Sequence, residues 1–301
     1  MSPRPDESPS HGLAPRAEMV RIRLTLGYDG TDYFGWAKQP GLRTVQGVLE
    51  TSLQDLLSNA GHATPASVTV AGRTDSGVHA RVQTVHLDLA DELWQRRGNL
   101  RLVGQLNANL PNDVRVLSAT AVPGDFDARF SALYRTYTYR VHDQTQYLHP
   151  LESRISVAHG VRLDVTRMAE ASHVLLGEHD FAAFCRYREG ASTVRTLREC
   201  DVVRLSEHEI KFTVVADAFC HSMVRSLVGA LVAVGEGKES SEWLTGLLAR
   251  TTRSDAVRVM PAAGLVLESI AYPSASQSGA QAQRARRFRE RPSSSVAPGG
   301  S

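Results

Sequence analysis

The sequence has few cysteines and no long apolar run, and each shortage narrows the classes of protein it can encode. Three of the 301 residues are cysteine (Cys185, Cys200 and Cys220), with no CxxC pair. This sparse, odd set predicts reduced thiols in a cytoplasmic protein, not a disulfide framework or a zinc site. The longest uncharged apolar stretch, 227–235, is much shorter than the ~18 residues that a membrane span needs. The first twenty residues lack the apolar core of a secretory signal. We therefore expect no membrane association.

Lysine is also scarce, because only Lys38, Lys211 and Lys238 are found among 34 basic residues. Arginine suits bidentate phosphate contacts and stacking on bases, although a composition bias of the source genome explains the same numbers. The net charge of +2 is unevenly spread: residues 273–301 carry +4, whereas the body, 19–272, carries −1. A near-neutral body does not by itself predict a nucleic-acid partner. Hydrophobic residues (42%) and charged residues (22%) are ordinary for a globular protein.

Hydrophobic periodicity predicts alternating strands and helices along the body. Period-2 or apolar segments predict strands over 20–28, 67–71, 82–89, 114–122, 133–142, 199–205, 209–219 and 264–270. Helical periodicity is found over 44–61, near 102–106, and over 164–177, 220–232 and 243–248. This order predicts an α/β (α+β type) fold of two similar subdomains, 19–124 and 125–272. Each would be a mixed, largely antiparallel sheet with helices packed on one side, and a cleft between them is the expected site. The Pro/Ser-rich residues 1–18 and the Arg-rich residues 273–301 are predicted to be a disordered leader and a disordered tail.

The segment AGRTDSGVHA (71–80) is the most unusual in the chain. It follows a short apolar strand, and Gly72 and Gly77 permit a tight turn that would put Asp75 at a loop apex. An ionised carboxylate there, near a cation, can act as a nucleophile or a base. The alternative is a turn in which Asp75 only ties down its own loop.

Other catalytic arrangements have weaker support. No second carboxylate suited to glycosidase chemistry stands out, because Asp125 and Asp127 resemble turn residues. Ser76 and His79 could suggest hydrolysis, but the chain has no GxSxG elbow. The histidines are not spaced as metal ligands, and the doublet ending in His221 is more typical of packing or surface.

Basic residues are interleaved with aromatic ones in FDARFSALYRTYTYRV (126–141), and RYREGASTVRTLR (186–198) is an Arg-rich loop. Such segments can grip phosphates and stack on bases, although an aromatic strand with solvated arginines is an equally good interpretation. Arg225 interrupts the most apolar helix and needs a partner. An Asp on the facing half would serve, and Asp217 is also close in sequence.

Taken together, these motifs resemble the tRNA pseudouridine synthase A family. The resemblance rests on eight segments in the family's order: YDGTDYFGW (28–36), AGRTDSGVHA (71–80), NANLP (107–111), DFDARFSA (125–132), YRTYTY (134–139), DFAAF (180–184), TVRTL (193–197) and AFCHSMVRSLVG (218–229). It covers 20–272 and leaves out both tails. Departures are small: Ala37 stands where Gln is common, and Ser76 is one of several residues seen after the Asp.

The resemblance implies an isomerase that converts uridine to pseudouridine at nucleotides 38, 39 and 40 of the tRNA anticodon arm, without a metal or an organic cofactor. It implies that Asp75 is the nucleophile, that Tyr137 stacks on the target base and that Arg225 pairs with Asp75. Arg73 would fill the space left by the flipped base. Because a tyrosine with an ordinary pKa near 10 is a poor base at neutral pH, positioning is the expected role of Tyr137.

The resemblance also implies two RNA-contact segments, a homodimer that shares one tRNA, and a cytoplasmic location. The segments are Phe126, Asp127, Ala128, Arg129 and Phe130, and Arg188, Glu189, Gly190, Ala191 and Ser192. Two alternatives from other classes are a non-catalytic RNA-binding protein on the same fold and a small-molecule hydrolase with an Asp nucleophile. The first could dispense with Asp75, and the second would need a metal or an acid partner that the sequence does not suggest.

Overall fold

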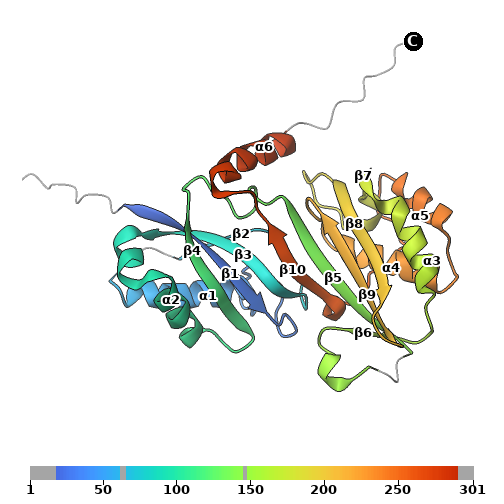
Figure 1. The fold of residues 1–301 in the computed structure, drawn as a ribbon, viewed down its shortest axis with the longest axis horizontal. Helices are drawn as coiled ribbons and strands as arrows, with labels where there is room; N and C mark the ends of the chain where they lie inside the picture. Colours follow the sequence, from blue (N-terminus) through green and yellow to red (C-terminus); the bar gives the residue numbers. More distant parts are fainter. Residues whose placement is uncertain (1–17, 62–65, 145–147, 291–301) are drawn as a thin grey trace, which may run out of the picture.

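The computed structural model describes residues 18–61, 66–144 and 148–290, and side chains as far as residue 286 (Figure 1). In this part of the chain, ten strands form one sheet: β1 (Met19–Tyr28), β2 (Thr69–Val70), β3 (His79–Ala90), β4 (Val114–Val122), β5 (Tyr134–Asp143), β6 (Val157–His159), β7 (Gly177–Asp180), β8 (Val194–Arg204), β9 (Glu209–Ala216) and β10 (Leu265–Ala271). The α-helices are α1 (Val45–Ser58), α2 (Asp91–Asn109), α3 (Val165–Ser172), α4 (Met223–Gly235), α5 (Ser241–Leu248) and α6 (Ser278–Glu290).

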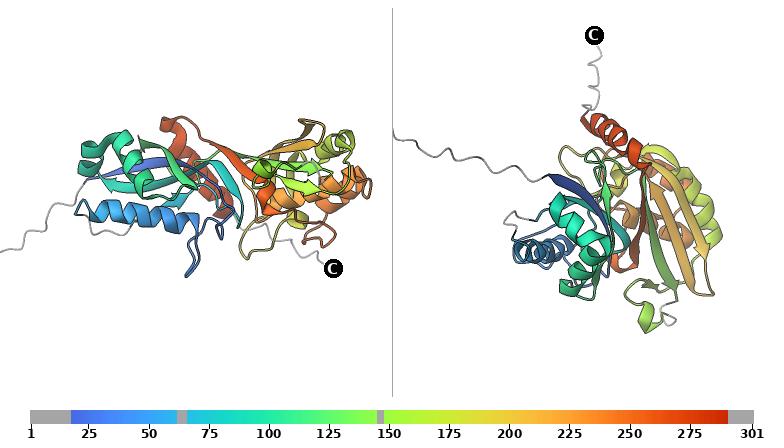
Figure 2. Two further views of the ribbon diagram at one scale, coloured as in Figure 1. Left: turned by 90° about the horizontal axis from the view of Figure 1, so that it is seen from below. Right: turned by 60° about the vertical axis from the view of Figure 1, so that its left-hand side comes forward.

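The sheet joins the two expected halves edge to edge. Its order is β4-β1-β3-β10-β5-β9-β8-β7, with β2 added on β3 and β6 on β5. Most neighbours are antiparallel, but β10 runs parallel to β3 over a short register in which Val266 faces His79 and Leu267 faces Ala80. Figure 2 shows α1 along the half that contains β1, and α4 and α5 beside the half that contains β9. The α/β architecture with largely antiparallel sheet is therefore confirmed.

Local sequence explains why the main elements form. In β1, the alternating side chains of Ile22, Leu24 and Leu26 are completely buried, as the period-2 pattern predicts. In α1, the Thr44 hydroxyl accepts a hydrogen bond from the backbone N–H of Gly47, which is the expected N-cap. The helix predicted near 102–106 is longer, because α2 continues back to Asp91 through a kink at Gly98, whose φ is +63°.

Two expectations were wrong. The predicted disordered tail is ordered in part, because Ala275–Gln277 forms a short 3-10 helix and Ser278–Glu290 forms α6. Residues 291–301 of that tail, and the leader apart from Glu18, lie outside the described residues. The Ser-, Gly-, Gln- and Arg-rich composition of this tail does not indicate a helix, because α6 packs on the body through few residues. The expectation of three reduced thiols also fails, because Cys185 and Cys220 form a disulfide with Cα atoms 5.7 Å apart. The fold brings together two cysteines 35 residues apart, and Cys200 stays free and buried.

Candidate active site

The loop that carries Asp75 is held from beneath by the segment 29–36. Gly77 N–H donates to the Tyr33 carbonyl (3.2 Å), and Trp36 N–H donates to the Thr74 carbonyl (3.1 Å). Gly35 adopts a φ of +83°, and a Cβ there would lie 2.9 Å from the Thr74 oxygen. The two motifs YDGTDYFGW and AGRTDSGVHA therefore form one substructure, in which the first fixes the backbone of the second.

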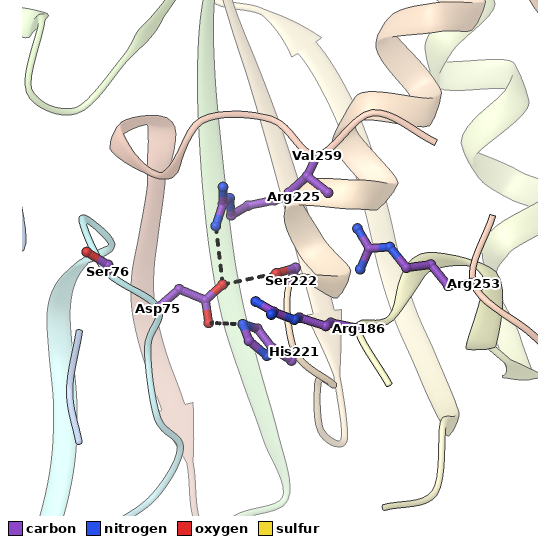
Figure 3. A pocket seen from close by; sticks show the side chains of 8 residues that line it. All are labelled: Asp75, Ser76, Arg186, His221, Ser222, Arg225, Arg253 and Val259. Atoms are coloured by element: carbon purple, nitrogen blue, oxygen red, sulfur yellow. Dashed lines mark hydrogen bonds and ion pairs between the residues drawn. The ribbon is translucent and has the colours of Figure 1, made fainter. Parts of the chain in front are cut away.

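The Asp75 carboxylate meets donors from the other half of the molecule (Figure 3). Arg225 Nη1 lies 3.3 Å from Oδ2, the Ser222 hydroxyl lies 3.4 Å from Oδ2, and His221 Nε2 lies 3.4 Å from Oδ1. The Asp75 side chain keeps 25% of its accessible surface. The carboxylate is thus oriented by the protein yet remains open to a substrate.

Arg225 is fixed at the first turn of α4. Its Nε donates to the Met260 carbonyl at 2.6 Å, so that Nη1 is directed to Asp75 across 150 residues of sequence. The sequence required a partner for this charge, and Asp75 provides it. The other candidate, Asp217, instead accepts a hydrogen bond from the Thr196 backbone N–H (3.0 Å).

A cavity of about 600 Å³ opens beside the carboxylate. The residues that line it are Asp75, Ser76, Arg186, His221, Ser222, Arg225, Arg253 and Val259 (Figure 3). Three arginines in one wall give the cavity a cationic character that suits a phosphodiester substrate. The cavity lies where the two halves meet, because Asp75 precedes β3 whereas Arg225 belongs to α4.

Tyr137 lies in β5 next to the site and not in the wall of the cavity. It is 8% exposed, and its ring meets the ring of Phe219 edge to face with centroids 5.1 Å apart. Burial raises the pKa of the Tyr137 hydroxyl well above its ordinary value of 10, and the nearby Tyr28 and Asp75 raise it further. Tyr137 is therefore protonated at neutral pH, and in this form it is not a base.

Arg73 differs from Arg225 in having no anchor. Its side chain is exposed, and within the described ranges it has no hydrogen-bond or ion-pair partner. A long, unpaired guanidinium two residues before Asp75 is free to meet a ligand.

The predicted RNA-contact segment 126–130 is partly buried. Phe126 and Ala128 are covered, and Asp127 caps the segment by accepting hydrogen bonds from the backbone N–H groups of Arg129 (2.8 Å) and Phe130 (2.9 Å). Arg129 is exposed, and its guanidinium lies 5.2 Å from the Phe130 ring centroid. Only the end of this segment therefore presents side chains to a ligand.

The second predicted segment, 188–192, is exposed throughout and follows Arg186 of the cavity wall. This loop therefore begins two residues after a residue that lines the cavity.

Three residues near the site were not predicted from sequence: His221, Ser222 and Arg253. Arg186 belongs to the Arg-rich segment 186–198 that the sequence did indicate. The sequence indicates packing or surface for His221, since a lone Cys-His doublet has no period or spacing that marks a site. Ser222 is marked as unusual only by the structure. Its φ of +64° is left-handed, which is uncommon for a residue with a side chain. Within the described ranges no group of three potential ligands could hold a metal ion, and no helix is long and apolar enough to cross a membrane.

Comparison with known proteins defines the class. A family model described as tRNA pseudouridine synthase matches residues 26–131 and 171–273, which include Asp75 and the three residues that contact its carboxylate, His221, Ser222 and Arg225. The chain is 49% identical over 274 residues to tRNA pseudouridine synthase A of Streptomyces avermitilis, covering 91% of this chain and 95% of the relative. It is 48% identical to the protein of that name from Cutibacterium acnes, covering 89% and 94%.

Solved structures are more distant. An H/ACA RNP bound to a substrate RNA containing 2'-deoxyuridine matches with a TM-score of 0.33 and 16% identity, covering 69% of this chain and 48% of that one. The matches in sequence are sufficient. The chain belongs to the tRNA pseudouridine synthase family, and it is an isomerase of the kind that its curated relatives represent.

Proposed function

We propose that the protein converts uridine to pseudouridine at nucleotides 38, 39 and 40 of the tRNA anticodon arm, with Asp75 as the nucleophile. The observation that carries this proposal is the open Asp75 carboxylate with the Arg225 guanidinium 3.3 Å away. The fixed guanidinium orients this carboxylate, which is the nucleophile of the proposed step. Atoms balance without a co-reactant: the N1–C1′ bond breaks, uracil turns, a C5–C1′ bond forms, and the proton lost from C5 is matched by one gained at N1.

The remaining residues prepare the base for this step. A uracil stacked in a stem must be extruded before it can be attacked, at a cost of a few kcal/mol. The exposed, unpaired Arg73 would occupy the vacated position in the stack and offset part of that cost. Tyr137, protonated and held against Phe219, would stack on the extruded uracil. Arg129, Phe130 and the loop 188–192 would contact the RNA backbone.

The assembly and location follow the family. We place the enzyme in the cytoplasm as a homodimer in which one tRNA contacts both subunits, and the chemistry proposed for Asp75 requires no metal or organic cofactor. The alternative of a non-catalytic RNA-binding protein is disfavoured, because a protein that only binds RNA gains nothing from an accessible carboxylate oriented by three donors.

The test is Asp75→Asn, measured by tritium release from C5-labelled uridine in tRNA. We expect turnover to be abolished and tRNA affinity to stay within about tenfold of the wild type, because phosphate contacts supply most of the affinity. Asp201→Asn, on the exposed face of β8, is the matched control and should keep full activity. More than trace tritium release by the Asp75 variant would remove this residue from the nucleophile role.

A further inference from the structure

The C-terminal helix α6 is docked on the RNA-contact segment 126–130. The Ser131 hydroxyl donates to the Ser278 carbonyl (2.9 Å) at the start of the helix, and Ala282 is 1% exposed. Gly279 lies so close to Asp125 that a Cβ would fall 1.8 Å from its Oδ2. One side of the helix therefore packs closely against the body. Figure 1 shows α6 across the region where β4 and β10 end.

Arg286 ties the helix to the accessible end of that segment. Its Nη2 lies 2.6 Å from Asp127 Oδ2, and its guanidinium lies 5.0 Å from the Phe130 ring centroid. Arg129 lies over the same ring, at 5.2 Å. Phe130 is thus flanked by one arginine from the body and one from α6, so the two elements share one aromatic side chain.

The same segment is coupled to the active-site loop. Arg135 Nη2 donates both to the Arg129 carbonyl (2.9 Å) and to the Ala71 carbonyl (3.0 Å), two residues before Arg73. Arg135 thus holds the backbone near Arg73 and the backbone of Arg129 side by side. A strand of RNA that reaches Arg73 can therefore continue toward Arg129 and α6.

Among the helix residues whose side chains the structure describes, Arg284 is the arginine without an acidic partner. It is exposed, and its hydrogen bond goes to a neutral partner, the Gln281 amide oxygen at 3.0 Å. No carboxylate in the described part of the chain pairs with it. The helix as a whole carries a net charge of +3, with Glu290 as its one acidic residue. A cation kept free of carboxylates on a docked helix is suited to an external anion.

We infer that α6 is an additional RNA-binding element, in which Arg284 contacts a backbone phosphate of the tRNA outside the site of the target uridine. This inference rests on the proposed function, since it takes tRNA as the ligand. The helix lies beyond residue 273, where the family match ends.

The experiment measures the dissociation constant of the full-length protein for an unmodified tRNA transcript as a function of salt. Losing one phosphate contact lowers the slope of log K against log salt by about 0.9. For Arg284→Gln we therefore expect weaker binding at low salt. We also expect the ratio of its dissociation constant to that of the wild type to fall about threefold between 50 and 200 mM salt. Arg284→Lys should restore most of the affinity, because a single phosphate accepts a point charge.

Arg101→Gln is the matched control, because Arg101 is an exposed arginine of another helix, α2. Equal losses in the Arg284→Gln and Arg101→Gln variants would mean a general charge effect and would overturn the inference, as would an Arg284→Gln variant that binds like the wild type at every salt concentration. The single-turnover rate at saturating tRNA should not change. If the proposed function were wrong, the wild type would release no tritium; if only this inference were wrong, the wild type would be active and the salt slope unaltered.

Discussion

Arg225 and Arg73 have different roles at the site, and substitutions can distinguish the two roles. Arg225 is anchored through Met260 and directed to Asp75, whereas Arg73 is exposed and unpaired within the described residues. An anchored guanidinium orients a carboxylate. A free one can enter a base stack, since it is planar and weakly hydrated.

Arg73→Lys should lose activity heavily although it keeps the charge. An ammonium is a compact, strongly hydrated point charge that cannot replace a base in the stack, so the Lys variant should bind tRNA yet leave the uridine stacked. The readouts are turnover and the fluorescence of 2-aminopurine placed beside the target nucleotide, with Arg101→Lys as control. Near-normal turnover and unstacking in the Lys variant would make Arg73 an ordinary phosphate contact.

Ser222 combines an unusual backbone with a contact to the nucleophile. Its φ of +64° costs roughly 1–3 kcal/mol in a residue with a side chain, and its hydroxyl lies 3.4 Å from Asp75 Oδ2. Ser222→Gly should therefore remove the hydrogen bond, worth about 1 kcal/mol, and lower kcat about fivefold. The free energy of unfolding should be unchanged or higher, because glycine accepts this backbone conformation. Thermal unfolding and single-turnover kinetics test both effects, and a large loss of stability without loss of rate would assign Ser222 a purely structural role.

At the scale of elements, the position of α4 determines where Arg225 points. Gly229, one turn after Arg225, packs so closely on the segment 258–260 that a Cβ would lie 1.9 Å from the Arg258 carbonyl oxygen. That segment also supplies the Met260 carbonyl that holds Arg225. The close approach of helix and backbone is thus part of the catalytic geometry.

Gly229→Ala should lower stability by about 1–3 kcal/mol and kcat with it, because the added methyl group displaces the backbone that anchors Arg225. The control is Gly246→Ala in α5, where nothing lies within 4 Å of the added Cβ; it should raise stability by about 0.5–1 kcal/mol and leave kcat unchanged. Urea unfolding and tritium release measure the two quantities. A Gly229→Ala enzyme with wild-type kcat would show that Arg225 does not depend on this contact.

The elements were predictable where one physical signal dominated. Apolar residues at alternate positions predict β1, and a capping threonine followed by an apolar helical face predicts α1; the structure has both elements. The short β6 and β7 have too few residues for a period to emerge. Helix α6 was missed because its stability depends on a few tertiary contacts, including the Ser131–Ser278 hydrogen bond, and not on an amphipathic pattern.

The site was predictable from sequence only in part. Asp75 stood out through its flanking glycines, and the charge of Arg225 in an apolar helix required a partner. His221 and Ser222 could not be found in this way, because their nearness to Asp75 results from the packing of two segments about 147 residues apart. Pairs of this kind leave no local pattern in a single sequence.

At the scale of the whole molecule, buried tyrosines make stability sensitive to high pH. Burial raises the pKa of Tyr28 to about 12, and it also raises the pKa values of Tyr137 and Tyr139 above 10. In the unfolded chain these hydroxyls ionise near pH 10, so above that pH the unfolded state has lost protons that the folded state retains. Their contribution to stability is therefore complete below pH 10 and is lost as pH rises toward the folded-state values.

We accordingly expect the urea midpoint to be steady up to about pH 9.5 and to fall steeply between pH 10 and 12. With only three lysines in the chain, lysine deprotonation adds little to this decline. Tyr28→Phe should make the decline less steep by up to 1.36 kcal/mol per pH unit. A midpoint that stays constant to pH 12 would contradict the assignment of these hydroxyls as buried and protonated.

The placement of β10 sets the order in which the enzyme becomes complete during its synthesis. This strand lies between β3 and β5 in the sheet, yet it is the last strand along the described residues. Asp75 belongs to the side of β3, and Tyr137 and Arg225 belong to the side of β5. A ribosome adding roughly 5–20 residues per second needs roughly 10–40 s to travel from Asp75 to Ala271. Until then the emerging chain holds two half-sheets with open edges and separated catalytic groups. An unfinished chain therefore cannot modify tRNA, although the ribosome that makes it is surrounded by that substrate.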